Sequence, residues 1–82
     1  MSPRLKQHLI PGPYRFYIVL FDCTERAHIH VDRENKSAKF WLEPVALASN
    51  YGYRKQDLRD IERKIPDNHQ TLLSFWDEYC RE

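Results

Sequence analysis

Two stretches of alternating residues most constrain the fold of this chain. In residues 27–33, and again in residues 37–43, apolar side chains occupy every second position. A period of two is typical of a strand with one buried face. A turn at Glu34-Asn35 would place three apolar pairs opposite one another: Ala27 with Leu42, Ile29 with Phe40, and Val31 with Ala38. Because a slip of one residue would turn every apolar side chain to the wrong face, the pattern predicts an antiparallel hairpin in this register.

The segments around this hairpin indicate further strands. Residues 14–21, YRFYIVLF, are almost all aromatic or aliphatic, and several are β-branched, which favours a strand covered on both faces. Residues 1–13 predict an N-terminal arm or edge strand that ends at the stiff Pro11-Gly12-Pro13 corner. Residues 45–48 could form one more short strand or a turn. We therefore expect a sheet of three to four strands, with its main part in residues 14–48.

The C-terminal third changes to a helical period. Apolar residues recur there at steps of three and four over residues 54–80, and the stripe keeps its phase across Pro66. A proline inside a helix costs about 3 kcal/mol, so the helix should be kinked or broken at Pro66. With 82 residues, the chain has room for one core only. The prediction is one α+β domain, with a small antiparallel sheet packed against this C-terminal helix.

Composition excludes several classes of function. The formal net charge is +1, whereas a nucleic-acid-binding domain is usually strongly basic, so binding to nucleic acid is not indicated. No window approaches the roughly 18 apolar residues of a membrane span, and residues 1–13 lack the apolar core of a signal peptide. The two cysteines, Cys23 and Cys80, have neither a CxxC nor a zinc-like spacing. We expect a cytoplasmic protein with reduced thiols.

His28 and His30 are the first candidates for a functional site. On a strand, both imidazoles project from the same face, as some zinc sites require. However, zinc needs at least a third protein ligand, and the predicted register puts the ammonium group of Lys39 opposite His30. His8 and His69 could approach from elsewhere, but no spacing indicates that they do. No metal and no cofactor are predicted.

Acid–base catalysis is a second interpretation of the pair. An imidazole titrates near neutral pH, and Lys39 with Arg33 could stabilise an anionic transition state on an RNA phosphate. This chemistry needs neither a metal nor a deep cavity, so it suits a short chain. A metal-independent ribonuclease using His28, His30, Lys39 and Arg33 is therefore the alternative function.

Trp41 favours a third interpretation. It falls on the otherwise polar face, opposite His28, where an indole is covered either by a helix of the same chain or by a partner. Tryptophan is also enriched at the energetic centres of protein interfaces. A partner-binding surface is predicted from residues on this face and near the end of the helix: His28, His30, Trp41, Trp76 and Tyr79. The interaction domain is preferred to an enzyme.

The sequence from about Tyr14 to Tyr79 resembles a bacterial family known only as domain of unknown function 4160. The matching segments are PYRFYIVLF, HIHV, AKFWLEPVALASNYGY and LLSFWDEYC. The chain departs from the family pattern at Arg26-Ala27, where members usually have proline before the first histidine. It departs again at Arg54, where serine usually begins the helix with a capping box.

The resemblance implies a small strand-hairpin-plus-helix domain, and it supplies no catalytic residues. Relatives are often encoded beside another small protein, which suggests toxin–antitoxin-like pairs. Together with the residue patterns, it leads us to expect a cytoplasmic protein-interaction domain. Its partner would be a protein encoded nearby or a second copy of the chain, and no membrane is involved.

Overall fold

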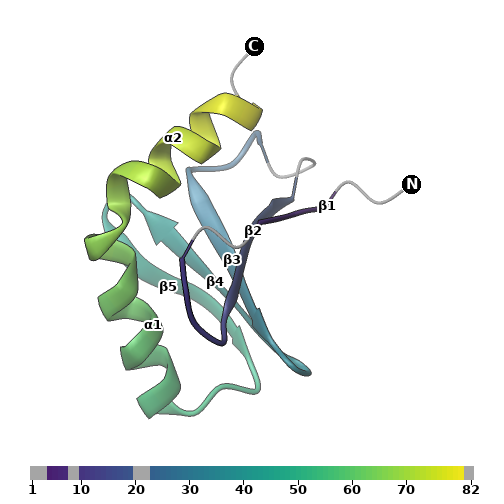
Figure 1. The fold of residues 1–82 in the computed structure, drawn as a ribbon, viewed down its shortest axis with the longest axis vertical. Coiled ribbons are helices and arrows are strands. Elements are labelled where there is room, and N and C mark those ends of the chain that lie inside the picture. The colour runs from purple at the N-terminus through teal and green to yellow at the C-terminus, as the bar shows by residue number, and fades with distance from the viewer. Residues whose placement is uncertain (1–3, 8–9, 20–22, 81–82) are drawn as a thin grey trace.

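The computed structural model describes residues 4–7, 10–19 and 23–80 (Figure 1). All strand pairs are antiparallel, and the sheet order follows the sequence, β1-β2-β3-β4-β5. The elements are β1 (Arg4–Gln7), β2 (Arg15–Val19), β3 (His28–Arg33), β4 (Lys36–Leu42), β5 (Val45–Tyr51), α1 (Lys55–Asp67) and α2 (His69–Cys80). The predicted α+β class is confirmed. Within the described residues, the sheet has five strands rather than three to four, because the N-terminal arm and the segment after Pro44 both pair with it.

The hairpin of β3 and β4 has the predicted register. Ile29 pairs with Phe40 and Val31 with Ala38, and the amide of Leu42 donates to the carbonyl of Ala27 at 3.0 Å. In the two-residue turn, Glu34 has the left-handed backbone, with φ of 56°. The apolar pairing therefore determines the register even though a residue with little preference for this conformation occupies the turn.

One face of the sheet forms the core with the two helices. Figure 1 shows both helices on the same side, where α1 packs on β5 and α2 on β4. Each large apolar side chain that is fully buried stabilises the fold by about 1.5–3 kcal/mol relative to exposure. The buried residues of this core include Phe16, Ile18, Ile29, Val31, Phe40, Leu42, Ile61, Ile65 and Leu72. The amphipathic stripe predicted for residues 54–80 is therefore the packing surface.

The helical segment is broken just after Pro66, as predicted. Pro66 lies in the last turn of α1, and Asn68 ends the helix through a hydrogen bond from its amide to the carbonyl of Ile65, at 3.1 Å. The imidazole Nε2 of His69, the first residue of α2, lies 2.7 Å from the carbonyl oxygen of Leu42. This contact ties the start of α2 to the end of β4. The break lets α2 change direction and cross the end of the sheet (Figure 1).

The expectation of two reduced thiols is wrong for this structure. Cys23 and Cys80 form a disulfide, with their Cα atoms 5.1 Å apart and a sequence separation of 57. The spacing of the two cysteines in the sequence does not indicate this bond. The path of α2 brings Cys80, the last residue of the helix, to Cys23 in the loop before β3. In the part of the chain that the structure describes, no helix is long and apolar enough to cross a membrane.

Candidate functional site

The candidate site lies on the face of the sheet opposite the main core. Pairing of β2 with β3 places Tyr17 beside His30, and pairing of β3 with β4 places His28 beside Trp41 and His30 beside Lys39. Paired residues of neighbouring strands project to the same side of a sheet. These five residues are called the histidine face below. The sheet, rather than any loop, fixes their arrangement.

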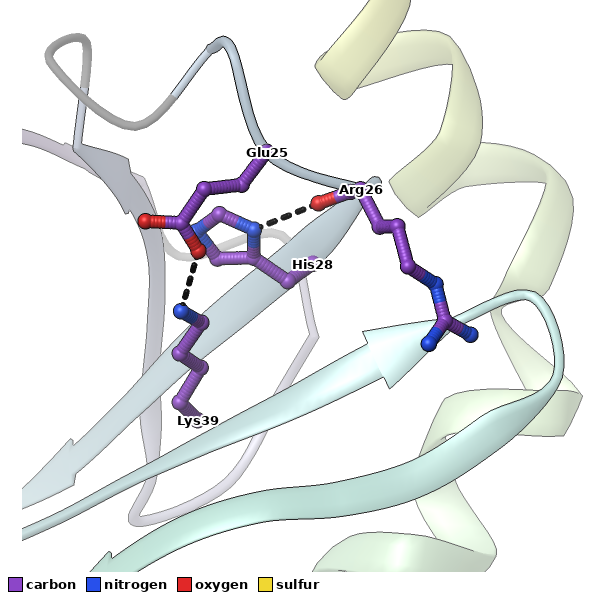
Figure 2. A network of polar contacts seen from close by, with 4 residues as sticks. All are labelled: Glu25, Arg26, His28 and Lys39. Atoms are coloured by element: carbon purple, nitrogen blue, oxygen red, sulfur yellow. Dashed lines mark hydrogen bonds and ion pairs between the residues drawn. The ribbon is translucent and has the colours of Figure 1, made fainter.

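His28 is the buried centre of the histidine face. Its side chain has no exposed surface, and its Nδ1 lies 2.7 Å from the backbone oxygen of Arg26 (Figure 2). Because a carbonyl oxygen can only accept, Nδ1 carries the proton and donates it. The ring centroid lies 5.2 Å from that of His30, 5.8 Å from Trp41 and 4.9 Å from Trp76. His28 thus connects the preceding loop, the hairpin and α2, and no external molecule can reach it in this conformation.

His30 is more accessible and has a different environment. It is half-buried, and its ring stacks on Tyr17 at 5.2 Å with an interplanar angle of 15°. The hydroxyl of Tyr17 donates to Oδ1 of Asp32 at 2.9 Å. This hydrogen bond fixes the ring on which His30 rests. The two histidines therefore differ: His28 is enclosed by rings, whereas His30 is only half-buried.

Trp41 lies at the edge of the histidine face with two cations against its ring. The guanidinium of Arg26 and the ammonium of Lys39 are each 4.8 Å from the ring centroid. Lys39 also forms an ion pair with Glu25 (Figure 2), and Arg26 donates to the backbone oxygen of Glu43 at 3.0 Å. Cation–π contacts of this kind contribute about 0.5–1 kcal/mol each at partly exposed sites. They hold the half-buried indole in place without covering it fully.

The two helix residues of the predicted surface also differ in how far they are exposed. Trp76 is 8 % exposed and belongs to the core cluster, and its ring also contacts His28. Tyr79 is 38 % exposed and rests edge-on against Phe75 at 4.7 Å. A helix of the same chain covers His28, while Trp41 and Tyr79 retain accessible surface.

The ribonuclease set is not brought together. Arg33 alternates with His30 and Asp32 along β3, so it projects to the side of Ile29 and Val31, and its guanidinium lies 5.6 Å from the ring of Tyr14. His28 is enclosed, and Lys39 is paired with Glu25. Of the four residues proposed for a ribonuclease, His30 and Lys39 are the two that lie together with accessible surface.

The metal-site interpretation can be compared with the described part of the chain. Among the described residues, no group of three or more His, Cys, Asp or Glu side chains could hold a metal ion. His69 contacts the backbone of Leu42, and His8 lies outside the described residues.

Sequence reasoning missed three residues that build the site. Arg26 and Glu25 come from the irregular loop before β3, and no periodic pattern in the sequence indicates where they lie. Tyr17 could have been found from its place in the strand 14–21, but only with the register between β2 and β3, which has no comparable pattern of apolar pairs.

The phenol of Tyr53 is a second buried polar group, and it contacts β3 near the turn of the hairpin. The hydroxyl of Tyr53 donates to the backbone oxygen of Val31 at 3.0 Å. Burial raises the pKa of this phenol well above its usual value, and the negative charge of Asp32 raises it further. Tyr53 therefore stays neutral over the physiological range and secures the corner before α1 to β3.

At that corner, Asp57 at position N3 provides one half of a capping box, although Arg54 rather than serine begins the helix. Its Oδ2 accepts a hydrogen bond from the amide of Arg54 at 3.3 Å. The departure at Arg54 is therefore compatible with an ordered start of α1.

The fold and the site define a small antiparallel-sheet domain with a histidine–tryptophan cluster on the face away from its main core. The chain belongs to the family described as Domain of unknown function (DUF4160), whose model matches residues 14–77. The resemblance noted from the sequence is thereby confirmed. No curated protein and no solved structure gives a significant match.

Proposed function

We propose that this chain is a cytoplasmic bacterial protein-interaction domain that binds its partner through the outer edge of the histidine face. The observation that supports the proposal is the position of Trp41. Its indole is half-buried, is held by Arg26 and Lys39 at 4.8 Å, and projects from the face of the sheet opposite the main core. A large aromatic residue held in one orientation loses little conformational entropy on binding, which suits an interface centre.

The buried and exposed members of the predicted surface have different roles in this proposal. His28 and Trp76 support the surface from below, because neither offers appreciable area to a partner. Trp41, His30 and Tyr79 make the contacts. The partner is either a protein encoded by a neighbouring gene, as in a toxin–antitoxin-like pair, or a second copy of the chain.

Co-purification with the product of the adjacent gene tests the first partner, and light scattering over a concentration series tests the second. Trp41→Ala should weaken the complex at least about 30-fold, the effect of removing an interface centre worth about 2 kcal/mol. Leu47→Ala is the matched control, since Leu47 is an apolar residue with accessible surface, 44 % exposed, but pairs with Phe40 on the opposite face. A monomer that captures no partner, or equal binding by Trp41→Ala, would reject the proposal.

A metal-independent ribonuclease is the second candidate. The approach of the two imidazoles to 5.2 Å, with Lys39 paired to His30, favours it. The burial of His28 and the distant position of Arg33 make it the weaker candidate. Under this hypothesis, induced expression arrests growth and His30→Ala relieves the arrest, whereas Tyr51→Ala, at an exposed position on β5, does not. Expression without any effect on growth would eliminate it.

A further inference from the structure

The disulfide and the histidine face meet at the end of α2. Cys80 follows Trp76 by four residues, so both side chains project from the same side of the helix. Trp76 packs against His28 at 4.9 Å, and Cys80 is bonded to Cys23 in the loop that leads to β3. The bond therefore continues the packing stripe of α2 by one turn beyond its last buried aromatic residue.

The three residues between Trp76 and Cys80 contribute little burial. Asp77, Glu78 and Tyr79 are all exposed, and the ring of Tyr79 contacts Phe75 of the same helix. Helix ends open with small free energies unless tertiary contacts secure them. The covalent tie to Cys23 is thus well placed to decide whether the last turn of α2 stays on the sheet.

We propose that the Cys23–Cys80 bond is a reversible redox clasp that controls access to the His28 side of the histidine face. A dithiol reductant supplies two electrons and two protons. The sulfur–sulfur bond breaks, Cys23 and Cys80 become thiols, and the reductant closes into its own disulfide. The last turn of α2 is then released, and Trp76 and His28 become accessible. In a cytoplasmic protein, where lasting disulfides are rare, such a bond acts as a sensor rather than as a permanent cross-link.

The redox clasp would regulate the same surface that the proposed function uses. Its biological role therefore rests on that proposed function. Its structural test needs no partner. A failure to find a partner would remove the interaction proposal and leave the clasp standing. A clasp that does not open would leave the interaction proposal standing.

The accessibility of Trp76 can be measured directly. The chain has two tryptophans, so Trp41→Phe leaves Trp76 as the sole indole. On reduction with dithiothreitol, acrylamide should quench its fluorescence with a Stern–Volmer constant at least twice that of the oxidised protein. The double variant Cys23→Ser/Cys80→Ser in the same background is the control, and it should match the reduced protein with or without dithiothreitol.

Hydrogen exchange on the unsubstituted chain provides a second measurement that does not depend on the Trp41 variant. Reduction should accelerate exchange in residues 76–80 and leave β4 (Lys36–Leu42) protected. An unchanged quenching constant together with unchanged exchange would overturn the clasp. Loss of protection throughout β4 would overturn it as well, because the bond would then be a general cross-link of the fold.

Discussion

Replacing His28 with alanine should destabilise the domain strongly, and the same change at His30 should not. His28→Ala removes a fully buried ring that contacts His30, Trp41 and Trp76, and it also removes the donor to the carbonyl of Arg26. Truncating a large buried side chain to alanine costs about 2–5 kcal/mol, and a hydrogen bond contributes about 1 kcal/mol. We expect a loss of about 3 kcal/mol. An 82-residue domain has roughly 4–12 kcal/mol in total.

The half-buried His30 provides the matched comparison. His30→Ala keeps Tyr17 and its hydrogen bond to Asp32, and it should cost about 1 kcal/mol. Urea denaturation at neutral pH separates the two variants. With a slope of about 1.5 kcal/mol per molar, the midpoint should fall by about 2 M for His28→Ala and by about 0.7 M for His30→Ala. Equal shifts would refute the distinction between a supporting and an accessible histidine.

Three further predictions test individual contacts. The ion pair of Lys39 with Glu25 is partly exposed, so a double-mutant cycle in urea should give a coupling energy below about 1 kcal/mol. The raised pKa of Tyr53 means that the folded state keeps the phenolic proton above pH 10, where the unfolded state loses it. Stability should therefore be complete below about pH 10 and fall as the pH rises further, and Tyr53→Phe should remove this component from alkaline urea titrations. Gly52 has φ of +100°, and a Cβ there would lie 3.3 Å from a side-chain carbon of Lys36. Gly52→Ala should thus lower the free energy of unfolding by about 1–2 kcal/mol, whereas an unchanged midpoint would contradict the strain argument.

The register of the hairpin could be predicted because local chemistry determines it. Ile29, Val31, Ala38 and Phe40 can be buried together in only one pairing, and the structure has that pairing. The break after Pro66 follows from the missing amide hydrogen and ring of proline in the same way. Both features depend on residues that are near one another in sequence.

The burial of His28 and the disulfide could not be predicted, because both depend on where α2 ends. The alternation of apolar residues shows that His28 faces away from Ile29. It does not show that Trp76, 48 positions further along the chain, covers the ring of His28. The same path of α2 brings Cys80 to Cys23. The sequence indicates that both helical halves are amphipathic. It does not indicate the angle between them, which sets the position of the last turn.

Hydroxyl-radical footprinting of exposed side chains tests the central claim most directly. The unsubstituted chain would be oxidised alone, over a concentration series, and with the product of the adjacent gene. We expect Trp41 and Tyr79 to become less reactive in the complex, while Tyr51, which is 71 % exposed on β5, keeps its reactivity. Protection of Tyr51 with unchanged reactivity at Trp41 would place the interface elsewhere and contradict the account.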